Sequence, residues 1–192
     1  MEKPNALKES LFSACCATLE KTGWKGFSFA KASEESGLPL SLFYDHFSSL
    51  SDIMIYLFKK LDREVLESIN ISEVDNPKDI LFDVLMIRFE AAQPYKLVLK
   101  SFWKDWIFTA DQAPPLLLQG FSSMAWMLEA AHIDTQGIKG FLRIQGLTTL
   151  YLLTLRTWLS DETPELGKTM AFLDKGLSRL EKMAGFLNTF EI

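Results

Sequence analysis

Helical periodicity runs through almost the whole chain and constrains the fold more than any other feature of the sequence. Apolar residues recur three and four positions apart, for example at Ile53, Leu57, Leu61 and Val65. No segment has the sustained apolar–polar alternation, bounded by turn residues, that indicates a strand. The sequence therefore predicts an all-α protein of about nine helices.

Glycine and serine mark the ends of three helices in the first part of the chain. The first helix is expected to end at Gly23, and the second to begin at Ser28 and end at Gly37, because glycine adopts positive φ at little cost. A third helix is expected over 40–47. We expect these three helices to form an N-terminal head of the helix-turn-helix type, residues 1–50.

A longer helix is expected to connect this head to the rest of the chain. Ser49 and Asp52 have the spacing of a capping box, and apolar residues continue at helical spacing over 50–69. The polar stretch 70–77 follows, and it ends in a proline suited to the first turn of a new helix. We expect this stretch to begin a helical body, residues 70–192.

Five further helices are expected in the body. Pro94 should stop the first, Asp134 or Thr135 should cap the fourth, and Pro164 should open the fifth. The expected ranges are 78–92, 95–108, 116–131, from the cap to 159, and from 164 almost to the C-terminus.

Composition narrows the class of protein. An apolar fraction of 48% supports a buried core, and it excludes disorder, which needs low hydrophobicity. Cys15 and Cys16 are adjacent, a spacing that suits neither a disulfide framework nor a metal site, so we interpret them as buried thiols. There is no signal-peptide pattern and no apolar run of about 20 residues. We expect a soluble cytoplasmic protein.

No pattern in the sequence predicts catalysis. His46 and His132 are the only histidines, and neither has neighbours at the spacing of a nucleophile or a metal site. A glycine-rich phosphate loop is also missing from the sequence. We expect no enzyme activity, no metal and no cofactor.

The segment 27–53, FSFAKASEESGLPLSLFYDHFSSLSDI, resembles the DNA-binding head of TetR-like regulators. The resemblance covers about a third of the chain, and both order and spacing agree. It implies a TetR-like fold, with a helix-turn-helix head and a body that binds a ligand and dimerises. The matching positions are the turn, the Leu-Tyr-x-His-Phe signature and the next helix cap: Gly37, Leu38, Phe43, Tyr44, His46, Phe47, Ser49 and Asp52.

The resemblance also implies which residues would contact DNA. In this family the positions of Tyr44 and His46 often bind phosphates, which orients the protein without reading the base sequence. The alternative is that both side chains pack or cap at the junction with the fourth helix. The residues expected at the DNA are Lys25, Ser28, Lys31, Pro39, Leu40, Ser41, Tyr44 and His46.

The charge of this head is unusual for a DNA-binding protein. The net charge of the chain is −5, and residues 1–60 hold seven lysines and seven acidic residues. No Lys or Arg lies between Lys31 and Lys59, and Leu40 and Leu50 stand where the family often has basic residues. Because non-specific affinity comes from neutralised phosphates, we expect weaker DNA binding than is usual for the family.

Two segments of the body, 83–96 and 159–177, resemble the ubiquinone-biosynthesis accessory proteins. Those proteins share the TetR-like fold, bind isoprenoid lipids and do not act as repressors.

The two resemblances lead to different hypotheses. The first hypothesis, from the head, is a homodimeric TetR-type regulator whose DNA binding is controlled by a small apolar ligand. The alternative is a lipid-binding accessory protein without DNA binding. A third, helical interaction module would use Leu40, Leu42 and Phe43 as its contact patch.

Aromatic and apolar residues of the body could line a ligand pocket, although each of them alone is more often a core residue. Arg88 and Arg143 fall in apolar stretches, and they could pair inside the pocket or extend to solvent. The candidate pocket residues are Phe89, Phe102, Trp103, Trp106, Phe121, Trp126, Leu147, Tyr151 and Trp158.

Apolar stripes on the last two helices could form a four-helix dimer interface. The alternative is that one stripe packs within the subunit. The candidate interface residues are Gly140, Gly146, Thr149, Leu150 and Leu153 on one helix and Met170, Leu173, Leu177 and Leu180 on the other.

Overall fold

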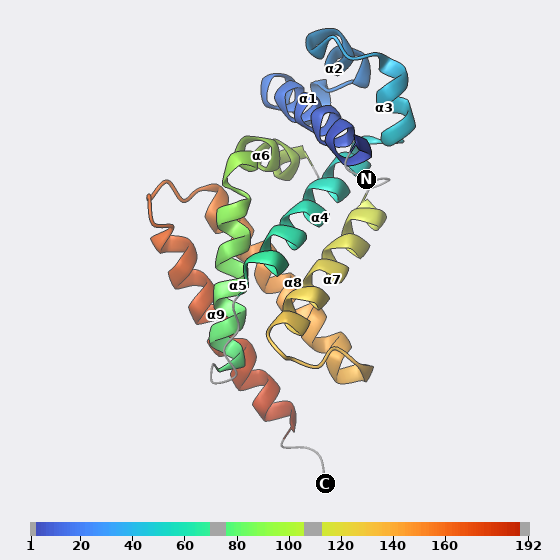
Figure 1. Cartoon of the computed structure of the whole chain (residues 1–192). Coiled ribbons are helices and arrows are strands. Elements are labelled where there is room, and N and C mark those ends of the chain that lie inside the picture. The colour runs from blue at the N-terminus through green and yellow to red at the C-terminus, as the bar shows by residue number, and fades with distance from the viewer. Residues whose placement is uncertain (1–2, 70–75, 106–112, 189–192) are drawn as a thin grey trace. The chain divides into compact units, whose positions relative to one another are not determined.

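The computed structural model describes residues 3–69, 76–105 and 113–188, and these residues form helices without a strand (Figure 1). The expected all-α fold is confirmed. None of the described helices is long and apolar enough to cross a membrane. The helices are α1 (Lys3–Gly26), α2 (Phe29–Ser36), α3 (Leu40–His46), α4 (Leu50–Ser68), α5 (Pro77–Ala91), α6 (Lys96–Asp105), α7 (Ala113–Ala130), α8 (Gly137–Leu159) and α9 (Gly167–Asn188), with a 3-10 helix at Gln93–Tyr95.

The helices group into two compact units, which we describe separately. The first unit comprises residues 1–57 and 94–117, and the second comprises residues 58–93 and 118–192. The body expected from the sequence, residues 70–192, differs from the second unit because residues 94–117 group with the head.

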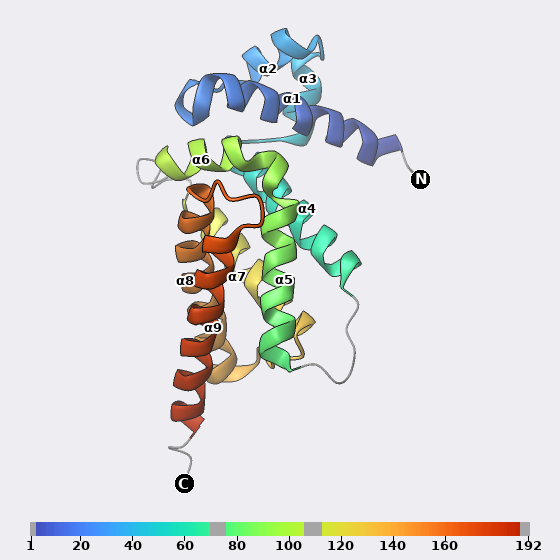
Figure 2. The same ribbon diagram turned by 90° about the vertical axis from the view of Figure 1, so that its left-hand side faces the viewer.

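Helix α6 packs on α1 within the first unit, as Figures 1 and 2 show. The ring centroids of Trp24 and Phe102 are 4.9 Å apart, and the backbone N–H of Trp24 donates a hydrogen bond to Ser101 Oγ at 2.7 Å. Gly23, with φ at 70°, breaks α1 where the sequence predicts its end, and a short helical stretch continues to Gly26. These contacts explain why α6 groups with the head.

The ends of the next helices follow the local signals in the sequence. Ser28 caps α2 by accepting a hydrogen bond from the N–H of Lys31, and Gly37 ends α2 with φ at 71°. At the start of α4, Ser49 Oγ accepts from the N–H of Asp52 at 3.3 Å, and Asp52 Oδ2 accepts from the N–H of Ser49 at 3.1 Å. The capping box is therefore confirmed.

The two cysteines of α1 are buried, as their spacing suggested. Burial raises the pKa of the Cys15 thiol to about 12. A thiol with so high a pKa stays protonated at neutral pH, which makes it a poor nucleophile.

The predicted start of α8 is wrong. The helix begins at Gly137 and its N-cap position is Gln136, whereas Asp134 or Thr135 was the expected cap. Asp134 Oδ1 instead accepts a hydrogen bond from the N–H of Gln136 at 3.2 Å. This side-chain turn directly precedes the helix, because Asp readily bonds to the backbone two residues on.

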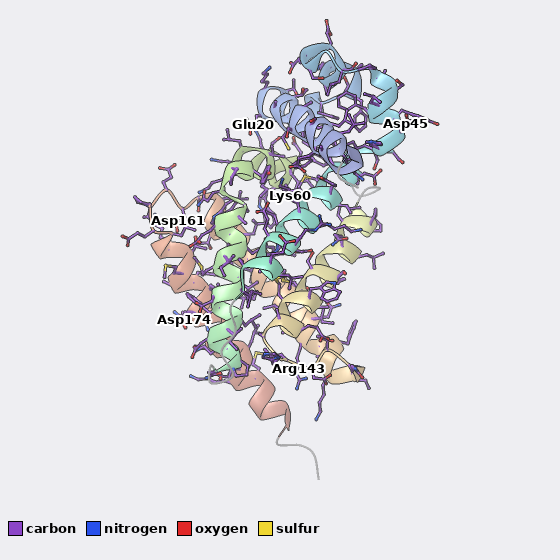
Figure 3. The ribbon with its side chains drawn as sticks, in the orientation of Figure 1. Glu20, Asp45, Lys60, Arg143, Asp161 and Asp174 are labelled. Atoms are coloured by element: carbon purple, nitrogen blue, oxygen red, sulfur yellow. The ribbon has the colours of Figure 1, made fainter. Side chains whose placement is uncertain are left out.

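The predicted start of α9 at Pro164 is also wrong, because α9 begins at Gly167. Asp161, which Figure 3 labels at the turn before α9, binds the first turn of that helix. Its Oδ2 accepts from the N–H of Thr169 at 2.9 Å and from Thr169 Oγ1 at 2.8 Å. Thr163 Oγ1 accepts from the N–H of Gly167 at 3.0 Å. Pro164 therefore lies in the loop.

Replacing Asp161 by alanine should lower the free energy of unfolding by about 1–2 kcal/mol at pH 7, as loss of a helix cap does. Burial of this carboxylate opposes its ionisation, but hydrogen bonds from Thr163 and Thr169 outweigh burial and hold the pKa of Asp161 below its ordinary value. The stabilisation is therefore fully present above the pKa of Asp in the unfolded chain, about 3.9, and it is lost progressively as the pH falls from there through the lower pKa of the folded protein.

Urea unfolding of wild type and Asp161→Ala at pH 7 and pH 3 measures this difference. The gap should shrink at the lower pH, and a gap of the same size at both values would contradict the assignment. Glu162→Ala is the control, because this neighbouring side chain is exposed and its removal should change stability by less than about 0.5 kcal/mol.

Candidate nucleic-acid interface and ligand site

A buried apolar contact and a tight turn fix the third helix against the second. Phe43 on α3 is fully buried, and its ring centroid lies 6.2 Å from that of Phe29. Across the turn, Ser33 Oγ donates to the carbonyl of Leu38 at 2.7 Å, and the N–H of Gly37 donates to the carbonyl of Ser33 at 2.9 Å. The two helices therefore form the expected helix-turn-helix.

The outward face of α3 carries four exposed side chains. Tyr44 is 82% exposed and Leu40 is 49% exposed. Ser41 and Asp45 are also exposed, and Asp45 is labelled on the outer side of α3 in Figure 3. These positions share one face because residues four apart are neighbours on a helix. Tyr44 thus neither packs nor caps, whereas His46 is half-buried at the end of α3.

The lysines expected at the DNA are partly occupied within the first unit. Lys25 Nζ lies 3.1 Å from Asp105 Oδ1. Lys31 Nζ donates to the carbonyl of Gly26 at 2.6 Å, while Ser28 acts as the cap of α2. Pro39 occupies the N-cap position of α3 and is exposed. Lys25, Lys31 and Ser28 therefore already have contacts within the protein.

The segment between Lys31 and Lys59 holds four acidic residues, and two of them, Glu35 and Asp52, are engaged in contacts. The hydrogen bond from Lys21 lowers the pKa of Glu35, whose Oε2 accepts from Lys21 Nζ and from Thr18 Oγ1, both at 3.1 Å. Asp52 belongs to the capping box of α4. Only Glu34 and Asp45 remain as exposed acids in this segment without such a contact among the described residues. The segment is less acidic at its surface than the sequence suggests.

An aromatic cluster lies inside the second unit. The rings of Phe89 and Tyr151 stack at 5.2 Å with an interplanar angle of 15°. The rings of Phe89 and Trp158 lie 5.8 Å apart, and Leu147 on the same helix as Tyr151 is buried. The structure therefore brings together Phe89, Tyr151 and Trp158 from the predicted pocket.

Other predicted pocket residues lie elsewhere. Phe102 packs on Trp24 in the first unit, to which the half-buried Trp103 also belongs. Trp126 is 57% exposed and lines a shallow surface hollow on α7 with Ser122, Ala125 and Glu129. Phe121 on α7 is half-buried, and Trp106 lies outside the described residues. Helical periodicity alone could not distinguish these positions from the residues that form the aromatic cluster.

Arg88 is the charged residue at the centre of the second unit. It is 2% exposed, and its Nη2 lies 2.9 Å from Asp62 Oδ1. The guanidinium carbon lies 5.2 Å from the ring centroid of Tyr151, and Ser123 Oγ donates to Asp62 Oδ2 at 2.6 Å. Arg143, by contrast, is half-buried and donates to the carbonyl of Asp134 at 2.8 Å. Of the two arginines, Arg88 is therefore the one that pairs with an acid inside the protein.

Asp62 is a functional candidate that the sequence analysis missed. Burial raises the pKa of its carboxyl group, although Arg88 and Ser123 oppose this. Burial also raises the pKa of Tyr151, which therefore stays a neutral phenol. The sequence does contain a signal for this role. Asp62 lies between the apolar positions Leu61 and Val65 of α4, and an acid buried there would need a cation beside it.

The predicted interface residues divide into two groups. Leu150, Leu173 and Leu177 are buried within the subunit, where α8 packs against α9, so the alternative of packing inside the subunit accounts for them. Leu153 and Met170 are 50% and 40% exposed. Gly146 lies against Leu180, and Gly140 lies against the backbone of Thr135. The dimer itself stays a prediction.

The sequence matches no family model and no curated protein, but the fold matches solved structures. A TetR transcriptional regulator from Nitrosomonas europaea ATCC 19718 aligns with a TM-score of 0.75 and 17% identity, covering 94% of this chain and 99% of that one. A TetR transcriptional regulator from Rhodococcus sp. RHA1 aligns with a TM-score of 0.65 and 14% identity, covering 93% and 97%. This chain therefore has the fold of TetR transcriptional regulators.

Proposed function

We propose that the protein is a homodimeric transcriptional regulator of the TetR type, whose DNA binding is controlled by a small apolar ligand. The helix-turn-helix carries this proposal: Phe43 and the Gly37 turn fix α2 and α3 and leave Leu40 and Tyr44 exposed. Both similar structures are TetR transcriptional regulators. No comparison supports the alternative of a ubiquinone-biosynthesis accessory protein.

The charges of the head support DNA binding that depends little on salt. Lys21 and Lys25 are exposed, but each is paired with a carboxylate, so they neutralise fewer phosphates than unpaired lysines would. Tyr44 has no hydrogen-bond partner among the described residues, and its exposed hydroxyl is able to donate to a phosphate. Such contacts orient the head, whereas lysine and arginine supply the salt-dependent part of the affinity.

Exposed apolar residues on the last two helices support a dimer. Ile138, Leu142 and Leu153 lie on one face of α8, at helical spacing, and are at least half exposed. Exposed apolar side chains gathered on one helix face often mark an interface between proteins. The dimer contact would then be formed by exposed residues, Met170, Phe172 and Met183 of α9 among them.

Ligand control would require two conformations with different ligand affinities, because a ligand shifts an equilibrium only by its differential affinity. The aromatic cluster of Phe89, Tyr151 and Trp158 supports an apolar binding site in the second unit.

A fluorescence anisotropy titration of DNA that flanks the protein's own gene, at low salt, tests the regulator function directly.

Adding a cation to the outer face of α3 should strengthen DNA binding and make it more salt-dependent. Leu40 is 49% exposed, so Leu40→Lys should leave the fold intact and place an ammonium beside the phosphates. The slope of log affinity against log salt should steepen by about 0.9 for each new phosphate contact. Anisotropy titrations of a random duplex between about 50 and 200 mM salt measure this slope.

Leu118→Lys on α7 is the matched control, because Leu118 is 69% exposed and lies outside the helix-turn-helix. The control should leave the slope unchanged. An equal gain from both lysines would show that α3 is not the DNA-facing helix.

A further inference from the structure

Arg88 has hydrogen-bond donors that the described part of the chain does not satisfy. Its Nη2 pairs with Asp62, but its Nε and Nη1 have no hydrogen-bond partner among the described residues. The side chain is 2% exposed, so bulk water does not solvate these donors. Because buried polar groups are almost always hydrogen-bonded, unmet donors on a buried guanidinium call for a partner.

Among the described residues, the surroundings of Arg88 do not supply that partner. Asp62 also accepts from Ser123, so its two oxygens already serve two helices besides its own. Aromatic rings lie beside the guanidinium: the ring centroid of Tyr151 is 5.2 Å from the guanidinium carbon, and Phe89 stacks on Tyr151. These rings offer apolar contact area around a cation with open donor positions.

We propose that Arg88 anchors the polar end of a ligand in the second unit, and that this ligand is an apolar molecule ending in an oxygen acceptor, a carboxylate or a carbonyl. The inference rests on the proposed function only in treating the second unit as the ligand-binding part. It specifies the chemistry of the ligand, which the regulator proposal leaves open beyond its being apolar.

The chemistry of arginine favours a ligand whose polar group accepts hydrogen bonds over one whose polar group donates them. The guanidinium presents five N–H donors in a planar fork and has no acceptor. A carboxylate fits this fork but adds a second negative charge beside Asp62, whose own carboxyl could then take up a proton because burial raises its pKa. A neutral carbonyl needs no such proton. An alkylammonium ion would be repelled by the guanidinium, which itself offers no acceptor.

Isothermal titration calorimetry on the full chain separates these ligands with three probes of matched chain length. The probes are octanoate, methyl octanoate and octylammonium. One or both acceptor probes should bind saturably with one site per chain, and octylammonium should bind at least about tenfold more weakly. Octanoate binding with proton uptake would identify the carboxylate form, and preference for the ester would identify the carbonyl form.

The double variant Arg88→Met/Asp62→Asn tests the anchor without leaving a buried unpaired charge. It should weaken the tighter acceptor probe by about tenfold or more, while circular dichroism shows unchanged helix content. Arg143→Met is the matched control, because Arg143 is bonded at the edge of α8 to Asp134 and should not affect binding.

Three results would overturn the proposal: no saturable binding of either acceptor probe, equal binding of octylammonium, or wild-type affinity in the folded double variant. None of these measurements involves DNA. A chain that binds octanoate through Arg88 but no DNA would uphold the anchor and contradict the regulator function, so the two proposals fail separately.

Discussion

Arg88→Met should lower the free energy of unfolding by about 3–5 kcal/mol, and adding Asp62→Asn should recover most of that loss. The single variant leaves the buried Asp62 without its cation, since Asp62 keeps only Ser123 as a hydrogen-bond donor among the described residues. The double variant removes both charges, and replacing a whole buried ion pair is often nearly neutral.

A double-mutant cycle measures this coupling by urea unfolding of wild type, Arg88→Met, Asp62→Asn and the double variant. Each single variant leaves one buried charge unpaired, so the sum of the two single losses should exceed the loss in the double variant by at least about 3 kcal/mol. Strictly additive losses would contradict the buried pair. Arg143→Met serves again as the control, because its partner Asp134 is exposed and exposed pairs contribute about 0–1 kcal/mol.

Gly140→Ala should destabilise the protein by about 1–3 kcal/mol or more, although alanine is the better helix former. A Cβ at position 140 would lie 1.9 Å from the carbonyl carbon and 2.0 Å from the carbonyl oxygen of Thr135. Backbone atoms cannot rotate away as a side chain does, so α8 or the preceding turn would have to move.

Gly120→Ala on α7 is the matched control, because a Cβ at position 120 has no heavy atom within 4 Å. There the substitution should be neutral or stabilising by up to about 1 kcal/mol. Urea unfolding compares the two variants, and equal stability would refute the close approach of Gly140 to Thr135.

Features that depend on neighbouring residues could be predicted from the sequence. The positive φ of Gly37, the Ser28 cap and the Ser49–Asp52 capping box are all confirmed. Each is determined within about one helical turn, so the chain itself holds both partners of the interaction close together.

Features that depend on distant partners could not be predicted in this way. Asp161 accepts hydrogen bonds from Thr169, eight residues further on, at the start of α9, and the helix begins at Gly167 and not at Pro164. Periodicity shows that α8 and α9 have apolar faces, but it cannot show that Leu150 points inward and Leu153 outward.

The candidate ligand site shows the same limit. Phe89 and Tyr151 were predicted from their apolar surroundings, and they lie together. Asp62 was missed because its partner Arg88 lies on another helix, 2.9 Å away in the structure but far along the chain. Phe102 was assigned to the same pocket, yet its contact with Trp24 belongs to the first unit.

The most direct test of the regulator function is a comparison of two duplexes, one from the DNA flanking the protein's own gene and one of random sequence. Fluorescence anisotropy at about 50 mM salt should show tighter binding to the flanking duplex. Tyr44→Ala should weaken that binding about fivefold, as loss of one hydrogen bond does, and Leu118→Ala should not. Binding no tighter than to random DNA would contradict the proposed function.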